Sequence, residues 1–242
     1  MSSTKETTPS ITEQDDRWTA VNHFQFPHLF PPSRPYHAAI EHAFKNSIDK
    51  GLEDISVAPS QGKFLAIQCQ IIGAKHVLEI GTLGAYSTIW MASVSPDIRI
   101  TTIEIDPHIA EIARENISFA GLDDRIEVFV GAALDVLPQL DAEIEQGKRE
   151  KYDFSFIDAD KENALPYFKW VVEHTVKKGV IYIDNIVRKG LLANAELAKT
   201  DPIVQGIRMA VEGVGKDDRV DAVVLQTVGE KNYDGFLMAM VM

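Results

Sequence analysis

The sequence contains little cysteine, an excess of acidic over basic residues, and no long hydrophobic run. Its single cysteine, Cys69, cannot form a disulfide within the chain, so we expect a reducing compartment. No apolar run approaches the roughly 20 residues of a membrane-spanning helix, so no membrane association is expected. The formal net charge of -12 argues against a nucleic-acid partner, because phosphate binding needs clustered Lys and Arg. Small molecules are the expected ligands.

Residues 1–16 also lack the features of a targeting sequence. They have neither an apolar signal region nor the Arg-rich, acid-poor character of a transit peptide, so we expect a disordered tail on a cytoplasmic protein. Residues 17–242 have an ordinary globular composition and are expected to form one domain. Within them, residues 17–55 are rich in aromatic residues and proline, and the prolines argue against a long helix before Tyr36. This segment is expected to act as a lid over the active site, as a dimerisation segment, or as both.

From residue 60 onward, helix-like and strand-like patterns alternate. The predicted strands are 76–80, 99–105, 126–130, 152–157 and 179–183, with helices at 60–73, 87–94, 107–120, 133–146 and 163–176. Such alternation predicts an α/β, Rossmann-like, doubly wound fold with a mostly parallel sheet. Two further strand-like runs, 221–228 and 235–242, lie too close together for a crossover helix. They predict a C-terminal antiparallel hairpin and a total of seven strands.

A glycine-containing turn follows the first predicted strand in HVLEIGTLGAYS. Gly81 and Gly84 allow the backbone to approach a ligand closely, and the next helix offers unpaired amide hydrogens to an anionic group. Leu83 and Ala85 stand where a dinucleotide-binding domain would need more glycines. An NAD-dependent dehydrogenase is therefore disfavoured.

The second predicted strand ends in Glu104, with Asp106 two residues later. A carboxylate at this position accepts hydrogen bonds from a ribose diol in NAD enzymes and in adenosyl-cofactor enzymes alike. Asp106 stands directly before Pro107, which is more typical of a helix N-cap. These features predict an adenosine-containing cofactor without identifying it.

Polar residues follow the fourth and fifth predicted strands, in FIDADK and YIDN. The carboxyl ends of adjacent parallel strands meet at one edge of a sheet, so Asp158 should lie near Asp184 and Asn185. Oxygen donors without sulfur or imidazole select Mg²⁺, Ca²⁺ or Mn²⁺ over zinc. Considered alone, Asp184 and Asn185 could equally form a turn or a helix cap.

In this order, the segments VLEIGTLGAYS, ITTIEID, GAALDVL, YDFSFIDADK and GVIYIDN resemble the cation-dependent class I O-methyltransferases, the caffeoyl-CoA and catechol O-methyltransferase family. The resemblance extends from about residue 56 to residue 191 and resumes in the C-terminal hairpin. It implies the class I methyltransferase fold. It also implies methyl transfer from S-adenosylmethionine to one hydroxyl of a catechol-type phenol or flavonoid, with Mg²⁺ or another divalent cation. Because relatives dimerise through N-terminal regions, a homodimer is expected.

The resemblance also assigns roles to individual residues. Lys161 would be the general base, and the metal ligands would be Asp158, Asp184 and Asn185. Nine positions would bind or adjoin S-adenosylmethionine: Val57, Glu79, Gly81, Thr82, Ser87, Glu104, Ala133, Asp158 and Asp160. Four would adjoin the acceptor: Asp158, Lys161, Arg188 and Lys189.

The chain departs from the family pattern at two places. Ala85 stands where the family usually has another glycine, and Arg188 with Lys189 replaces the aromatic residue of the plant enzymes. The plant enzymes' substrate therefore does not transfer to this chain. The two cations could select an acidic acceptor or could simply be solvated. The alternative functions are a tRNA methyltransferase acting on modified uridines, which the net charge disfavours, and a non-catalytic cofactor-binding partner protein.

Overall fold

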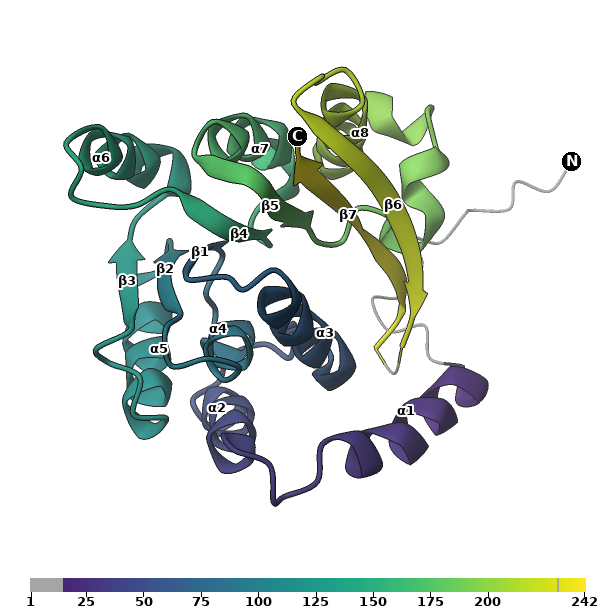
Figure 1. Ribbon diagram of the computed structural model, residues 1–242. Helices are drawn as coiled ribbons and strands as arrows, with labels where there is room; N and C mark the ends of the chain where they lie inside the picture. Colours follow the sequence, from purple (N-terminus) through teal and green to yellow (C-terminus); the bar gives the residue numbers. More distant parts are fainter. Residues whose placement is uncertain (1–14, 230) are drawn as a thin grey trace, which may run out of the picture.

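The computed structural model describes residues 15–229 and 231–242 and contains a mixed, mostly parallel sheet (Figure 1). In the described part of the chain the sheet has seven strands in the order β3-β2-β1-β4-β5-β7-β6. The strands are β1 (His76–Ile80), β2 (Arg99–Glu104), β3 (Ile126–Val130), β4 (Tyr152–Ile157), β5 (Thr175–Ile183), β6 (Val220–Val228) and β7 (Tyr233–Val241). The first five pair in parallel, and β7 is antiparallel to both β5 and β6. The predicted doubly wound sheet with a terminal hairpin is confirmed.

Helices cover both faces of the sheet (Figure 1). The helices are α1 (Asp16–Leu29), α2 (His37–Asp49), α3 (Pro59–Ile71), α4 (Tyr86–Ala92), α5 (Pro107–Phe119), α6 (Ala133–Glu145), α7 (Ala164–Glu173) and α8 (Pro202–Val214). Short 3₁₀ turns occur at η1 (Lys161–Asn163), η2 (Arg188–Ala193) and η3 (Leu197–Lys199). No helix among the described residues is long and apolar enough to cross a membrane.

The alternation of strand side chains divides the core into two hydrophobic layers. Val77 and Phe154 point toward the layer that contains α2 to α5, and Leu78 and Ile181 point toward the layer with α6 to α8. Both layers are needed because β1, β2 and β4 are largely buried on both faces, as parallel strands usually are. Cys69 is fully buried in the first layer as a free thiol.

The N-terminal segment differs from the prediction. Although no long helix was expected before Tyr36, α1 contains 14 residues and includes Pro27. This proline lies in the last turn of the helix, so any distortion that its ring causes is confined to the C-terminal end. At the other end, the Asp15 side chain accepts from the Arg17 N–H and caps the helix. Helix α1 begins at Asp16, which was assigned to the tail, and residues 1–14 lie outside the described part.

Aromatic contacts attach this segment to the rest of the fold. The Phe30 ring is buried, and its centroid lies 4.4 Å from that of Trp90 on α4. The Phe26 ring contacts the same indole edge-on, with its centroid 6.4 Å away. The N-terminal aromatic residues therefore contribute to the core.

Candidate active site

A cavity of about 1100 Å³ opens where the parallel strands end. Its wall contains residues that follow each of β1 to β5, together with residues of the β6–β7 hairpin. In open α/β sheets this edge is the usual place for ligands. Most of the residues assigned from the sequence lie in this wall: Val57, Gly81, Thr82, Ser87, Glu104, Ala133, Asp158, Asp160, Lys161, Asp184, Asn185 and Arg188. Glu79 and Lys189 are not among the wall residues.

Gly81 allows the ends of β1 and β4 to approach closely. Its φ is +101°, and a Cβ at this position would lie 2.5 Å from the carbonyl oxygen of Asp158. Any other residue would therefore force the two loops apart. Ala85 adopts the left-handed conformation with φ of 59° at the N-cap of α4, where the family pattern has glycine. Its methyl group makes this conformation mildly strained.

Glu79 holds the start of α4, which follows the glycine turn, through hydrogen bonds. Its side chain is fully buried and accepts hydrogen bonds from Ser87 Oγ at 2.6 Å, Thr88 Oγ1 at 2.5 Å and Thr102 Oγ1 at 2.7 Å. Burial raises the pKa of Glu79 to about 7, although the three hydroxyl donors act in the opposite direction. Glu79 was expected to line the cofactor site. It instead holds Ser87, which does lie in the wall.

Glu104 fixes the turn that follows β1 to the end of β2. Its carboxylate accepts from the Leu83 N–H at 2.8 Å and from the Asp106 N–H at 3.1 Å. Asp106 accepts from the His108 and Ile109 amides and caps α5, which confirms its predicted role. Glu104 thus presents a nearly buried carboxylate at the edge of the cavity.

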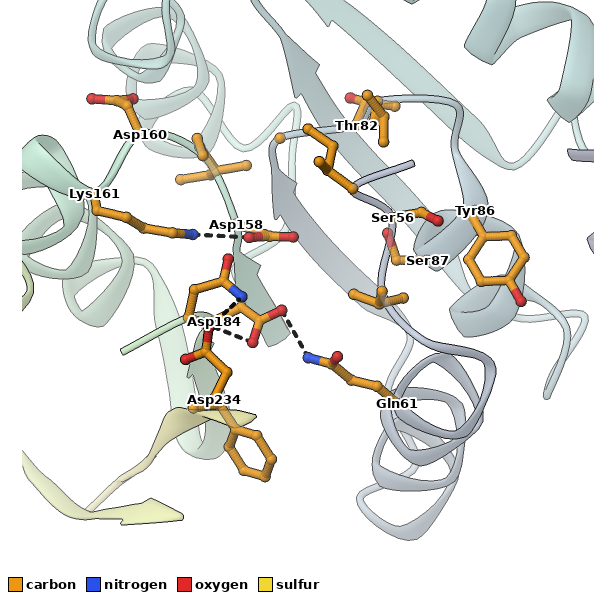
Figure 2. A pocket seen from close by; sticks show the side chains of 18 of the residues that line it. Ser56, Gln61, Thr82, Tyr86, Ser87, Asp158, Asp160, Lys161, Asp184 and Asp234 are labelled. Atoms are coloured by element: carbon orange, nitrogen blue, oxygen red, sulfur yellow. Dashed lines mark hydrogen bonds and ion pairs between the residues drawn. The ribbon is translucent and has the colours of Figure 1, made fainter. Parts of the chain in front are cut away.

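Lys161 and Asp158 form an ion pair on the floor of the site, where they point toward each other (Figure 2). Lys161 Nζ lies 2.8 Å from Asp158 Oδ1, and the lysine is only 7% exposed. Lys161 begins η1, directly after the loop that leaves β4. The short loop between β4 and η1 thus places the Lys161 amine beside Asp158 at the end of the strand.

Asp184 lies beside this pair at the end of β5. Gln61 reaches it from α3 and donates to Asp184 Oδ2 at 2.7 Å, and the Asn185 N–H donates to Oδ1 at 2.8 Å (Figure 2). Burial and the neighbouring Asp158 raise the pKa of Asp184 to about 7. The site therefore carries more negative charge than Lys161 neutralises, and a bound cation would offset it.

The donor set fits a hard divalent cation. The described residues contain no group of three or more His, Cys, Asp or Glu that could hold a metal ion. The predicted ligands are of a different kind, because they comprise two carboxylates and one amide: Asp158, Asp184 and Asn185. Asn185 is left-handed, with φ of 51°, a conformation that asparagine tolerates well. Its amide nitrogen donates to Asp234 at 3.4 Å, so its amide oxygen is not used in that contact. Each Asp184 oxygen already accepts one hydrogen bond but can accept a second contact, and Asp158 Oδ2 accepts none from the described residues. These oxygens, with the Asn185 amide oxygen, suit Mg²⁺, Ca²⁺ or Mn²⁺.

Asp160 lies at the cavity wall but points away from the ion pair (Figure 2). It accepts from Tyr167 OH and from Asn163 Nδ2, each at 2.5 Å. Burial and the Asp160 carboxylate raise the pKa of Tyr167. Asp160 therefore joins the loop after β4 to α7.

Three residues near the site were not predicted from the sequence. Gln61 contacts Asp184, Asp234 contacts Asn185, and Asn116 donates to the Gly84 carbonyl at 2.9 Å. Their partners are at least 30 positions away in the chain, so no local pattern could identify them. The polarity of Asn116 within the apolar stripe of α5 was the one available signal.

Of the segment 17–55, Asp54 and Ile55 are part of the cavity wall. Lys231 in the β6–β7 hairpin donates to Asp54 Oδ1 at 2.5 Å and to the Ser56 carbonyl at 2.8 Å. The hairpin and the loop before α3 are thereby joined beside the cavity. Helices α1 and α2 lie on the α3–α5 side of the molecule (Figure 1).

The fold is that of a class I methyltransferase. Residues 33–239 match the model of a family described as O-methyltransferase, and the chain belongs to this family. It is 53% identical over 246 residues to O-methyltransferase imqG of Aspergillus flavus, with all of both chains covered. It is 42% identical over 192 residues to a catechol O-methyltransferase of Mycobacterium tuberculosis, which covers 78% of this chain and 82% of the relative.

Solved structures agree with this assignment. An O-methyltransferase from Bacillus cereus, in complex with SAH, superposes with a TM-score of 0.85 at 44% identity and covers 94% of this chain and 99% of its own. TomG from Streptomyces achromogenes, in complex with SAM, has a TM-score of 0.85 at 35% identity, covering 95% and 99%. The resemblance inferred from the sequence motifs is therefore confirmed at the level of fold and family.

Proposed function

We propose that the protein transfers a methyl group from S-adenosylmethionine to one hydroxyl of a catechol-type phenol or flavonoid, and that the reaction requires a divalent cation. The observation that carries this proposal is the placement of Lys161 beside the oxygen cluster of Asp158, Asp184 and Asn185, in the same cavity as the glycine turn. Relatives named catechol O-methyltransferase support the acceptor class.

The half of the cavity near β1 and β2 suits S-adenosylmethionine. Glu104 can accept hydrogen bonds from a ribose diol at the end of β2. Ser87 is held by Glu79 and can donate to, or accept from, the methionine end of the cofactor. Gly81 and Ala133 leave room for close approach of ligand to backbone.

Asp158, Asp184 and Asn185 would hold the cation. When bound, it would supply positive charge that favours the ionised form of a hydroxyl beside it. Gln61 orients Asp184, and Asp234 orients Asn185, so both donors are held in place by neighbours. We propose Mg²⁺, with Ca²⁺ and Mn²⁺ as the alternatives that the same donors accept.

Lys161 would accept the proton of the reacting hydroxyl at Nζ, in its neutral form. Its burial excludes water, and its hydrogen bond to Asp158 Oδ1 fixes the direction of the amine. The rest of the cavity would hold the acceptor oxygen in line with the methyl group. Such positioning can contribute roughly 7 to 11 kcal/mol in favourable cases.

We also propose that the protein is a homodimer that uses α1. Val21, Phe24 and Leu29 on this helix are 59%, 72% and 62% exposed, respectively. Exposed apolar side chains that lie together on one helix are typical of a surface that a partner covers.

Incubation of the purified protein with S-adenosylmethionine and a panel of catechols, with and without a chelator, tests the proposed function. The expected product has the mass of a monomethylated catechol, appears only without chelator, and returns when excess Mg²⁺ is added. Unchanged mass for every catechol, or full activity in chelator, would contradict the proposal.

A further inference from the structure

Three cations line the cavity, and they differ in their partners. Lys161 is paired with Asp158, and Lys231 is paired with Asp54. For the Arg188 guanidinium, no ion pair or hydrogen bond is found with any described residue. Arginine keeps its charge under all ordinary conditions and presents planar donors that match a carboxylate or a phosphate. The positive charge of Arg188 acts on the nearby Asp234 carboxylate, lowering a pKa that burial raises, but its N–H donors form no hydrogen bond among the described residues. They are therefore available to an anionic group of the ligand.

The backbone at Arg188 is held in an unusual conformation. Arg188, Lys189 and Gly190 are all left-handed, with φ of 47°, 56° and 85°. Two of the three are not glycine, so the turn is strained, and such strain persists only where neighbouring structure enforces it. Here Asp234 enforces it, because its Oδ1 accepts from the Arg188 N–H at 2.7 Å and from the Gly235 N–H at 2.9 Å.

Asp234 connects Arg188 to the oxygen cluster. The same carboxylate that accepts from the Arg188 amide also accepts from the Asn185 amide nitrogen, at 3.4 Å. The Arg188 backbone therefore lies near the position proposed for the reacting hydroxyl, and its side chain can reach a group on the acceptor ring or on a short side chain.

The charge of the surrounding wall makes this cation significant. Asp158, Asp184 and Asp234 all border the same part of the cavity. Without a compensating cation they would repel a negatively charged acceptor. Arg188 offsets part of this repulsion and can add a charge-assisted hydrogen bond.

We infer that Arg188 determines acceptor specificity by binding a carboxylate attached to the catechol ring directly or through a short side chain. This inference rests on the proposed function and narrows its substrate class to dihydroxyaryl carboxylates. Lys189 does not share the role, because it is not a wall residue and its Nζ is buried without a hydrogen-bond partner among the described residues.

The test compares 3,4-dihydroxybenzoate with 3,4-dihydroxybenzamide, which has the same shape and no charge. The wild type should methylate both, and Arg188→Gln should reduce the benzoate-to-benzamide ratio of kcat/KM by about tenfold or more, mainly through KM for the benzoate. Arg188→Lys should restore part of the ratio. Lys169→Gln removes a positive charge from the exposed side of α7, outside the cavity wall, and should leave the ratio unchanged.

A third acceptor separates the possible sources of negative charge. A catechol thioester of coenzyme A carries phosphates far from the ring, and Arg188→Gln should reduce its kcat/KM no more than that of the benzamide. A larger loss for the thioester than for the benzoate would overturn the assignment to a nearby carboxylate. Equal ratios in wild type and Arg188→Gln would overturn the inference while leaving the proposed function intact. Absence of methylation of every catechol would overturn both.

Discussion

Lys161 Nζ and Asp158 Oδ1 lie 2.8 Å apart at the end of β4, in a position where the lysine is almost inaccessible to solvent. The pair places a basic group and a cation ligand three residues apart in the sequence and in direct contact in space. A single loop can therefore supply both the base and part of the cation site.

Lys161→Met should reduce kcat by roughly 10²- to 10⁴-fold, the range expected for loss of a general base. The binding constant for S-adenosylmethionine should change little, because Glu104 and Ser87 lie on other loops. Steady-state kinetics and calorimetric titration of the cofactor measure the two effects separately. Lys169→Met, on the exposed side of α7, is the control for loss of a lysine. Retained turnover in Lys161→Met would exclude it as the base.

Divalent cations should stabilise the wild type and should stabilise Asp184→Asn much less. At a Mg²⁺ concentration of about 100 times its dissociation constant, the gain in unfolding free energy is about 2.7 kcal/mol. Asp184→Asn removes a buried carboxylate that Asp158 repels, so the metal-free variant should be at least as stable as the wild type. Thermal melting with Mg²⁺ and with chelator measures both. An equal response to Mg²⁺ in the two proteins would exclude Asp184 as a ligand.

Glu79 should make the cofactor-free protein less stable as the pH rises from about 4.5 to about 7. Its folded pKa is raised above the unfolded value, so the folded state binds more protons in this window and loses stability as they dissociate. A shift of this size corresponds to about 3 kcal/mol. Urea unfolding of wild type and Glu79→Gln at pH 5 and pH 8 tests this. The wild type should lose more stability than the variant between these pH values, and parallel losses would contradict the expectation.

Asn116→Ala should lower the unfolding free energy by about 1 to 3 kcal/mol, because it leaves buried polar partners unpaired. Asn116 Nδ2 contacts the Gly84 carbonyl and Ser47 Oγ, at 2.9 and 3.2 Å respectively, and thereby joins the glycine turn to α2. Binding of S-adenosylmethionine should weaken because the turn loses this support. Glu111→Ala on the exposed side of the same helix is the control. Unchanged cofactor affinity in Asn116→Ala would show that the turn holds its shape without this contact.

Phe24→Glu should shift the protein from dimer to monomer. The Phe24 ring is 72% exposed in one subunit and would be buried by the partner in the proposed dimer. A carboxylate at this position would then be buried without a partner, which is costly. Light scattering during size-exclusion chromatography measures the mass directly. Lys45→Glu, an exposed change on α2, should leave the mass unchanged. A wild type that is monomeric at all concentrations would contradict the dimer.

The strand ends were predictable from the sequence because their signals are local. The predicted limits of β1, β3 and β4 agree with the structure, since each strand is bounded by charge or glycine. The carboxyl ends of parallel strands necessarily share one edge, so the order of the strands is enough to predict that Asp158 lies near Asp184. The Asp106 cap of α5 was predictable for the same reason, because its signal is the adjacent Pro107.

The supporting contacts of the site were not predictable, because they join distant parts of the chain. Gln61 lies 123 positions from Asp184, and Asp234 lies 49 positions from Asn185. The packing of α1 through Phe30 overrode the helix-breaking tendency of Pro27 for the same reason. Strand β5 begins at Thr175 instead of the predicted residue 179. α7 ends at Glu173 instead of 176, and Thr175 Oγ1 donates to the Val171 carbonyl at that end.

The most direct measurement follows a deuterium-labelled methyl group from S-adenosylmethionine into the product. A catechol and its monohydroxy analogue are incubated in parallel with the Mg²⁺-loaded protein, and the products are analysed by mass spectrometry and NMR. The proposed function predicts one labelled methyl on one oxygen of the catechol, with little or no label on the monohydroxy analogue. Label on carbon or nitrogen, equal labelling of the two acceptors, or no transfer to either would contradict it.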